Sequence, residues 1–217
     1  MKNYSVETQC VQAGYEPKSG EPRVAPIVQS TTYKYDDADQ VAALFDLSAV
    51  GHMYSRISNP TVEVLEKKLA VLEGGVGALG VASGQSANFF AIFTLCSAGD
   101  NFICLSNLYG GTHTLFTSTL KRMGIEATIL PCTIEPKEIA KHVNSKTKLL
   151  FAETLGNPGV EVLDIEAFAK AAHDNKLAFV VDNTFATPYL CRPIEHGADI
   201  VTHSATKYLD GHATSLG

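Results

Sequence analysis

Lysine, aspartate and hydroxyl side chains stand where they could serve one reactive site. Lys207 follows Ser204 and Thr206 in a chain of 217 residues. A lysine amine can attack a carbonyl carbon, and hydroxyls can donate hydrogen bonds to a phosphate. Asp182 ends an apolar run, which predicts a buried strand that presents a carboxylate at a sheet edge. Together these side chains favour a cofactor that is bound to the lysine.

Pyridoxal 5'-phosphate needs this combination, because it offers the protein an aldehyde, a pyridine nitrogen and a phosphate. Lys207 would form a Schiff base with the aldehyde, and Asp182 would bind the ring nitrogen. The two hydroxyls would contact the phosphate. Alone, each residue is better explained as a surface lysine or a structural aspartate, but their combination favours the cofactor.

Two further segments supply matching groups. Gly84 and Gln85 follow Ser83 at the start of an expected helix, whose first backbone N–H groups can bind an anion. A simple helix cap by Ser83 is the alternative. Tyr109 follows an expected strand, so its ring could stack on a heteroaromatic cofactor or only pack within a glycine-rich turn. Both segments are expected at the sheet edge that carries Asp182.

The spacing of apolar residues predicts an α/β fold. A helix is expected from 59–61 to Gly74, and strands then alternate with helices. The expected strands are 78–82, 101–105, 126–130, 148–152, 178–181 and 200–202. The expected helices are 86–96, 114–123, 136–143 and 165–175. This alternation predicts an α/β fold with a mainly parallel sheet and helices on both faces.

The first 60 residues differ from the rest. Pro, Gly, Ser and Thr punctuate them, and their periodicity is weak. Such a segment is typical of a linker or of an ordered arm that packs on another surface. Residues 1–60 are therefore expected to form an arm, and residues 61–217 a cofactor-binding domain.

Gly75, Gly77 and Gly80 match the glycine spacing of a dinucleotide-binding loop. That spacing has meaning only between a strand and the helix that follows it. Here the glycines follow an expected helix and lead into an expected strand, so a glycine-rich turn is favoured. A nicotinamide-dependent oxidoreductase would need a strand before Gly75.

Composition limits the partners and the location. Hydrophobic residues make up 45% of the chain, the formal net charge is −6 and the pI is about 5.6, without a cluster of Lys or Arg. This balance argues for an ordered globular domain and against nucleic acid or a membrane as partner. The dispersed cysteines lack metal-ligand spacing, and no apolar stretch reaches the roughly 20 residues of a membrane span. A cytoplasmic protein without a metal site is expected.

Several motifs in order resemble the Cys/Met-metabolism family of pyridoxal-phosphate enzymes, which has fold type I. They lie at 54–61, 82–85, 107–112, 153–158, around Asp182, and at 203–207. The resemblance implies that Lys207 binds the cofactor and then moves protons, while Asp182 keeps the ring nitrogen protonated. It also implies that Tyr109 stacks on the ring and assists proton transfer, that Asn157 lies near the ring hydroxyl, and that Thr184 contacts the ring.

The same resemblance implies a phosphate site. Gly84 and Gln85 would bind the phosphate through backbone amides, beside the hydroxyls that precede the lysine. Tyr54 and Arg56 would reach the phosphate of a neighbouring subunit, so that active sites are shared in a dimer or tetramer. The alternative for Arg56 is that it only caps or solvates the next helix.

Within that family the chain resembles the O-acetylhomoserine sulfhydrylases at 24–27, 108–112 and 187–199. The implied reaction is γ-replacement on O-acetylhomoserine by sulfide or a thiol, which gives homocysteine or methionine. Methionine γ-lyases usually carry cysteine where Gly111 stands. Methionine γ-lyase activity and the cystathionine γ-synthase or lyase reactions stay open as alternatives.

Two departures from the family pattern bear on function. The lysine motif continues as Asp210, Gly211, His212 and Ala213, where many members have a different glycine pattern. The chain is also about half the usual family length, and the resemblance implies a C-terminal domain whose arginine binds the substrate carboxylate. A non-catalytic fragment is therefore a second hypothesis.

Overall fold

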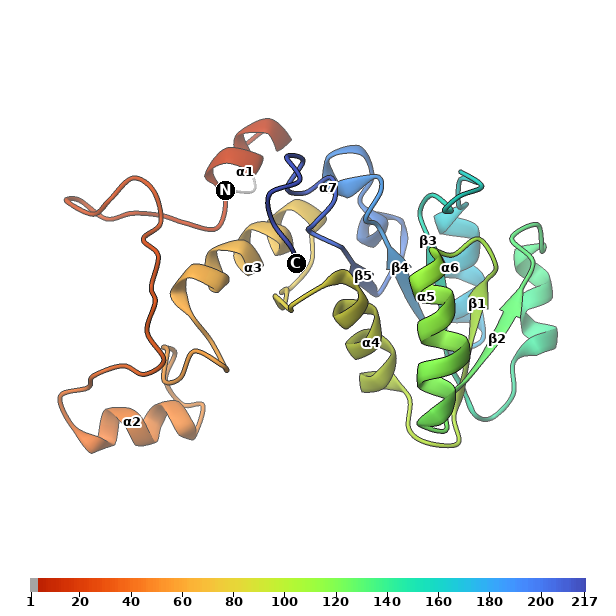
Figure 1. Cartoon of the computed structure of the whole chain (residues 1–217), viewed down its shortest axis with the longest axis horizontal. Helices are drawn as coiled ribbons and strands as arrows, with labels where there is room; N and C mark the ends of the chain where they lie inside the picture. Colours follow the sequence, from red (N-terminus) through yellow and green to blue (C-terminus); the bar gives the residue numbers. More distant parts are fainter. Residues whose placement is uncertain (1–3) are drawn as a thin grey trace. The chain divides into compact units, whose positions relative to one another are not determined.

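The computed structural model describes residues 4–217 and divides the chain into two compact units, Met1–Gly80 and Val81–Gly217. The second unit contains a five-stranded sheet in the order β2-β1-β3-β4-β5 (Figure 1). Its strands are β1 (Asn101–Leu105), β2 (Glu126–Leu130), β3 (Thr147–Glu153), β4 (Ala178–Asp182) and β5 (Ile200–Thr202). All neighbouring strands are parallel, which confirms the predicted fold class.

Helices cover both faces of this sheet. Helix α4 (Gly84–Leu95), helix α5 (Gly110–Thr114) and the π-helical segment η1 (Leu115–Leu120) follow one another in sequence around β1. Figure 1 shows α5 on the opposite side of the sheet from α6 (Ile165–Asp174). The 3-10 helix η2 (Pro136–His142) packs with α6.

Alternating strand residues build the two halves of the core. Phe102 and Cys104 belong to the cluster formed with α4 and η1, whereas Ile103 and Leu105 belong to the cluster formed with α6. In the first cluster Phe116 lies edge-on to Phe102, with ring centroids 4.9 Å apart. Successive strand residues point to opposite faces of the sheet. A strand that is apolar at nearly every position can therefore pack against the helices on both faces.

Some expected elements differ from those observed. Residues 78–82 form no strand, because this glycine-rich stretch is mostly exposed and joins the two units. The helix expected at 114–123 begins earlier, at Gly110, and includes the π-helical segment. The helix expected at 136–143 is a 3-10 helix. Two short helices, α7 (Thr187–Leu190) and η3 (Pro193–His196), were not expected.

The first unit is ordered by a few helices and a polar network. It contains α1 (Val6–Gln12), α2 (Ala38–Phe45) and α3 (Pro60–Glu73). Helix α3 ends at Gly74, whose φ of 74° lies in the left-handed region that suits glycine. The glycines at 75–80 follow this helix, so the strand required for a dinucleotide loop is not there.

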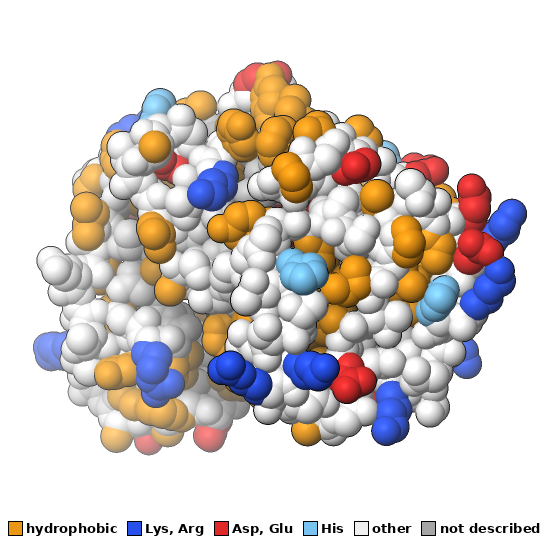
Figure 2. Space-filling model, turned by 45° about the vertical axis from the view of Figure 1, so that its right-hand side comes forward, with side chains coloured by type: hydrophobic (Ala, Val, Ile, Leu, Met, Phe, Trp, Pro, Cys, Tyr) orange, Lys and Arg blue, Asp and Glu red, His pale blue; other side chains and the backbone are white. Residues whose placement is uncertain are grey.

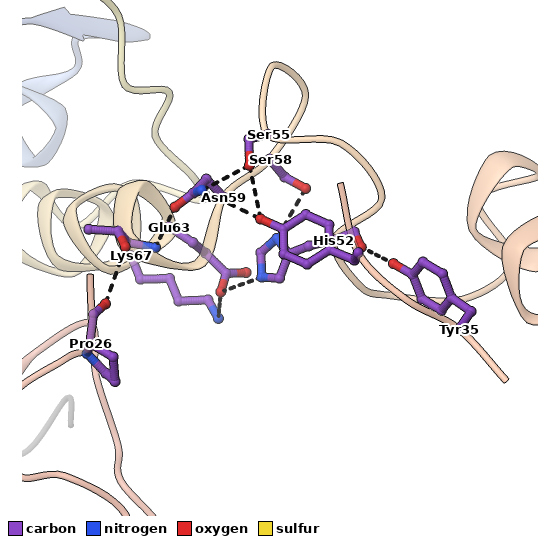
Figure 3. A network of polar contacts seen from close by, with 10 residues as sticks. Pro26, Tyr35, His52, Ser55, Ser58, Asn59, Glu63 and Lys67 are labelled. Atoms are coloured by element: carbon purple, nitrogen blue, oxygen red, sulfur yellow. Dashed lines mark hydrogen bonds and ion pairs between the residues drawn. The ribbon is translucent and has the colours of Figure 1, made fainter. Parts of the chain in front are cut away.

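Asn59 forms hydrogen bonds that connect the start of α3 to the segments before it (Figure 3). Its Oδ1 accepts a hydrogen bond from the backbone N–H of Thr61, at 2.9 Å. Its Nδ2 donates to Ser55 Oγ at 2.9 Å and to the Val28 carbonyl at 3.0 Å. Nearby, Glu63 pairs with Lys67 at 3.0 Å. The segment 54–58 is therefore tied to the N-terminus of α3 rather than left as a loose linker.

The surface mixes charges of both signs. On the face drawn in Figure 2, acidic and basic side chains are spread among hydrophobic and uncharged ones. Within residues 4–217 no helix is both long and apolar enough to cross a membrane. Across the same residues, no three or more His, Cys, Asp or Glu side chains gather as metal ligands would.

Candidate functional site

The carboxyl edge of the parallel sheet collects most of the predicted site residues. Tyr109 follows β1, Asn157 follows β3, Thr184 follows β4, and Ser204 follows β5. Strand β1 has β2 as its neighbour on one side and β3 on the other, so the direction in which strands are added to the sheet reverses after β2. Such a reversal of strand order opens a crevice where α/β proteins bind ligands. The sheet therefore places these segments at the edge where a ligand is expected.

Asp182 is the last residue of β4, and each of its carboxylate oxygens accepts a hydrogen bond. Asn88 Nδ2 donates to Oδ2 at 3.0 Å, and the backbone N–H of Thr184 donates to Oδ1 at 3.0 Å. The Asp182 carbonyl accepts from the Thr154 N–H at 3.0 Å. The carboxylate is therefore held by groups from two elements and has a defined direction.

Thr184 joins Asp182 to the loop that carries the lysine. Its hydroxyl accepts a hydrogen bond from the Ser204 N–H at 2.7 Å, while its own N–H donates to Asp182. The sequence indicated only a ring contact for Thr184. In the structure it connects the ends of β4 and β5.

Gly84 brings the N-terminus of α4 against the same loop. A Cβ at this position would lie 2.6 Å from Ser204 Cβ and 2.8 Å from Ser204 Cα, so only glycine permits the approach. Ser83 caps the helix by accepting a hydrogen bond from the Ser86 N–H at 3.1 Å. The plain capping role and the close approach of Gly84 to Ser204 are thus both present.

Lys207 lies in the turn that follows, and its side chain is exposed. Its backbone N–H donates to the Ser204 carbonyl at 3.1 Å, which closes the turn. The hydroxyls of Ser204 and Thr206 both contact the Gly217 carbonyl, at 3.5 Å and 3.1 Å. A phosphate at these hydroxyls would take the place of that carbonyl.

Tyr109 is fixed through its backbone to a buried acid that the sequence reasoning missed. The Tyr109 N–H donates to Glu153 Oε1 at 2.8 Å, while the tyrosine itself is 52% exposed and free to meet a ligand. Glu153 is 6% exposed and is the register partner of Asp182 on the neighbouring strand. Burial raises the pKa of Glu153 to about 8, the Tyr109 hydrogen bond opposes the rise, and the charge of Asp182 adds to it.

Asn88, Thr112 and Thr202 were not predicted as site residues, and the side chain of Gln85, which was predicted only for its backbone amide, contacts one of them. Gln85 Nε2 donates to Thr112 Oγ1 at 3.0 Å, and Thr202 Oγ1 donates to Asn88 Oδ1 at 2.6 Å. Asn88, Thr112 and Thr202 are all buried. Asn88 is one of three polar residues in the expected helix 86–96, beside Ser86 and Thr94, so the sequence carried no specific signal for it.

The structure does not bring every predicted residue together. Among the described residues, Asn157 is exposed in the turn after β3 and makes no hydrogen bond to Asp182 or Lys207. Tyr54 and Arg56 belong to the first unit, where the Arg56 guanidinium lies 5.4 Å from the centre of the Tyr54 ring. Their predicted role at a neighbouring phosphate stays a prediction.

The residues of the second unit fit pyridoxal phosphate in their chemistry. Gly84 brings the N-terminus of α4 close to the loop that carries the Ser204 and Thr206 hydroxyls. Backbone N–H groups and hydroxyls of this kind can bind a phosphate. The Asp182 carboxylate is fixed at the same edge, where a ring nitrogen would need an acceptor. Lys207 follows in the same loop as the hydroxyls. Amine, acceptor and phosphate donors are therefore all available from one unit.

A five-stranded parallel sheet covered by helices on both faces is the architecture expected of a fold-type-I protein. Residues 7–217 match the family model of the Cys/Met metabolism PLP-dependent enzymes. The chain belongs to this family, which confirms the resemblance inferred from the motifs.

Curated proteins that are similar to this chain include O-acetylhomoserine sulfhydrylases. The chain is 44% identical to O-acetyl-L-homoserine sulfhydrylase of Leptospira meyeri over 217 residues, which are 100% of this chain and 49% of that protein. It is 47% identical to O-acetyl-L-homoserine sulfhydrylase 1 of Thermus thermophilus, over 97% of this chain and 50% of that protein. The chain thus spans about half the length of the curated relatives it matches.

A solved structure agrees with this placement. A Campylobacter jejuni protein provisionally named O-acetylhomoserine (thiol)-lyase superposes with a TM-score of 0.94 at 40% identity, over 99% of this chain and 52% of that one. That protein carries an N'-pyridoxyl-lysine-5'-monophosphate. The lysine adduct is a property of that relative, and it motivates the proposal for Lys207 below.

Proposed function

We propose that this chain provides the cofactor-binding part of a pyridoxal-phosphate-dependent aminocarboxypropyltransferase of the O-acetylhomoserine sulfhydrylase type. The observation that carries the proposal is the Asp182 carboxylate, held at both oxygens at the sheet edge where the Lys207 loop and the Gly84 helix end meet. The relatives of similar sequence support the choice of branch. The overall reaction breaks the Cγ–O bond of O-acetylhomoserine, releases acetate and forms a Cγ–S bond to sulfide or a thiol.

Each residue has a distinct task in this proposal. When bound, pyridoxal phosphate supplies an aldehyde for amines and a ring that withdraws electrons from the substrate carbons. Lys207 holds the cofactor and then moves protons at the substrate carbons. Asp182 keeps a proton on the ring nitrogen, since a carboxylate stabilises a neighbouring cation. Tyr109, exposed and anchored by Glu153, stacks on the ring and assists departure of the acetate.

The phosphate is bound by the remaining residues. Gly84 and Gln85 offer backbone N–H groups at the start of α4, and Ser204 and Thr206 offer hydroxyls from the lysine loop. Asn157 would contact the ring hydroxyl of the cofactor, and Thr184 holds the Asp182 carboxylate and the lysine loop together. Tyr54 and Arg56 complete the phosphate site of a neighbouring subunit in a homo-oligomer.

Gly111 favours replacement chemistry over a methionine γ-lyase, which usually has cysteine at that position. A Cβ at Gly111 would lie 2.5 Å from Cε1 of the Tyr109 ring, so any side chain there would displace the ring. The cystathionine γ-synthase and lyase reactions remain alternatives. The matched half-length supports a further alternative, a cofactor-binding part without activity of its own.

Borohydride reduction tests the cofactor assignment. The protein is incubated with pyridoxal phosphate, reduced and cleaved, and the labelled peptide should contain Lys207. The Lys207→Arg variant should lose the label and serve as the control. Label on another lysine, or none in a protein that binds the cofactor tightly, would refute the assignment.

Substrate assays separate the possible reactions. Acetate release from O-acetylhomoserine that depends on sulfide or a thiol supports γ-replacement. Faster turnover of methionine or cystathionine than of O-acetylhomoserine would support the lyase alternatives. A comparison of O-succinylhomoserine with O-acetylhomoserine tests which acyl group the substrate carries. A protein that takes the label on Lys207 but turns over none of these substrates would support the non-catalytic alternative.

A further inference from the structure

Asn88 connects helix α4 to the Asp182 carboxylate. The side chain is 1% exposed, and its Nδ2 donates to Asp182 Oδ2 at 3.0 Å. A buried amide is costly unless its groups find partners, so its surroundings reveal what it is there to hold. Asn88 lies four residues after Gly84, about one turn of helix beyond the proposed phosphate site.

Thr202 sets the direction of the Asn88 amide. Its hydroxyl donates to Asn88 Oδ1 at 2.6 Å, and Thr202 is the register partner of Asp182 on β5. A carboxylate only accepts hydrogen bonds, so it requires the NH₂ side of the amide. A flipped amide would place its oxygen against the Asp182 carboxylate and lose the Thr202 bond.

Thr112 extends the connection to the start of α4. Its Oγ1 lies 3.0 Å from Gln85 Nε2 and 3.5 Å from Asn88 Nδ2. Thr112 itself is fully buried in α5. The helix end proposed for the phosphate and the carboxylate proposed for the ring nitrogen are therefore joined by one chain of hydrogen bonds, which is buried at its centre and part-buried at its two ends.

We propose that Asn88 is a positioning residue that holds Asp182 at a fixed place relative to the N-terminus of α4. This inference rests on the proposed function. A cofactor bound by its phosphate at the helix end meets an acceptor already placed for its ring nitrogen. Pre-organisation of this kind gives selectivity for a ligand that has both groups at the right separation.

The prediction is a selective loss of affinity, which ligand pairs can measure without turnover. One ligand is pyridoxal phosphate, and the other is its analogue with a C–H in place of the ring nitrogen. Asn88→Leu keeps the side-chain volume similar but removes the donor. It should weaken binding of pyridoxal phosphate by about tenfold, as expected for a lost charge-assisted hydrogen bond. Affinity for the analogue should stay close to that of the unmodified protein.

A second variant and a matched control guard against a general loss of structure. Thr202→Val removes only the hydroxyl that directs the Asn88 amide, and it should weaken binding in the same selective way. Thr147→Val makes the same chemical change at the amino end of β3, where the Thr147 hydroxyl accepts from the Asn144 N–H at 3.0 Å. This control should leave the affinity for both ligands unchanged.

The outcomes separate the two proposals. Equal losses for both ligands in the Asn88 and Thr202 variants would mean a structural role and overturn the inference. The inference would also be overturned if the variants preferred pyridoxal phosphate over the analogue by the same factor as the unmodified protein. If the unmodified protein binds neither ligand, or binds without reducible attachment to Lys207, the proposed function falls and this inference with it.

Discussion

Two carboxyl groups stand side by side at the carboxyl edge of the sheet in different surroundings. Asp182 accepts an N–H hydrogen bond at each oxygen, whereas Glu153 is buried and accepts one from Tyr109. Burial raises the pKa of Glu153 to about 8, so near neutral pH this group keeps its proton. A neutral Glu153 adds no second charge next to Asp182, which is consistent with the proposed pairing of Asp182 with a cationic ring nitrogen.

The buried Glu153 predicts a stability that depends on pH. Between its ordinary pKa of 4.5 and its folded pKa of about 8, the folded protein holds a proton that the unfolded chain releases. The contribution is therefore fully present below pH 4.5 and is lost as the pH rises toward 8. The free energy of unfolding should fall by up to about 1.4 kcal/mol per pH unit because of this group.

Urea unfolding at several pH values measures this slope. Glu153→Gln retains an acceptor for the Tyr109 N–H but cannot titrate, so its slope should be flatter than that of the unmodified protein. Glu126→Gln, at an exposed position at the start of β2, should leave the slope unchanged. Identical slopes for the unmodified protein and the Glu153 variant would contradict the raised pKa.

Asp182→Asn should leave pyridoxal phosphate bound but remove most turnover, because a neutral amide cannot stabilise the charge of the ring nitrogen. A charge-assisted hydrogen bond of roughly 1.5 to 3 kcal/mol corresponds to about one to two decades in rate. The rate of acetate release per bound cofactor measures the effect. Near-normal turnover in this variant would exclude the proposed role of the carboxylate.

At the scale of elements, the site depends on how closely α4 approaches the loop after β5. Gly84→Ala would place a Cβ 2.6 Å from Ser204 Cβ and force the two segments apart. The expected cost is roughly 1 to 3 kcal/mol in the free energy of unfolding. Gly110→Ala is the matched control, since nothing lies within 4 Å of a Cβ there.

Chemical unfolding and cofactor titration together test this contact. The Gly84 variant should be less stable and should bind pyridoxal phosphate more weakly, because the helix end moves away from the lysine loop. The Gly110 variant should be at least as stable as the unmodified protein. A Gly84 variant with normal stability and normal affinity would show that the close approach is unnecessary.

The buried strands were predictable from the sequence because their residues pack on both faces of the sheet and are therefore apolar at successive positions. The runs that became β1, β3 and β4 are apolar at successive positions, and each supplies both core clusters. The stretch 78–82 has similar residue types but lies exposed between the two units, where apolar character does not produce pairing. Composition alone could not distinguish these cases.

The candidate site was predictable where a residue sits in a local motif. Asp182 ends β4, Gly84 begins α4 and Lys207 lies shortly after β5, and the structure places their segments at one sheet edge. Asn88, Thr202 and Glu153 act through contacts between elements that are far apart in sequence, so no local pattern reveals them. Register between parallel strands, which only the fold provides, pairs Asp182 with both Glu153 and Thr202.

At the scale of the whole molecule, the proposed function gives the first unit a role through Arg56. The segment 54–58 is tied to α3 through Asn59, and Arg56 is exposed beside Tyr54. The proposed phosphate site of the second unit offers backbone N–H groups and hydroxyls, and the lysine of its motif, Lys207, is assigned to the cofactor aldehyde. An arginine fork from another subunit would neutralise a phosphate dianion.

Mixing two inactive variants tests whether Arg56 serves a neighbouring subunit. Arg56→Ala and Lys207→Ala proteins are dissociated, combined in equal amounts and reassembled, and acetate release from O-acetylhomoserine is measured. Half of the randomly formed dimers are mixed and each has one intact site, so activity should recover to about a quarter of the unmodified level. Each variant reassembled alone is the control and should stay inactive. Mixtures that assemble normally but remain inactive would place Arg56 within its own subunit's site and refute the sharing of sites.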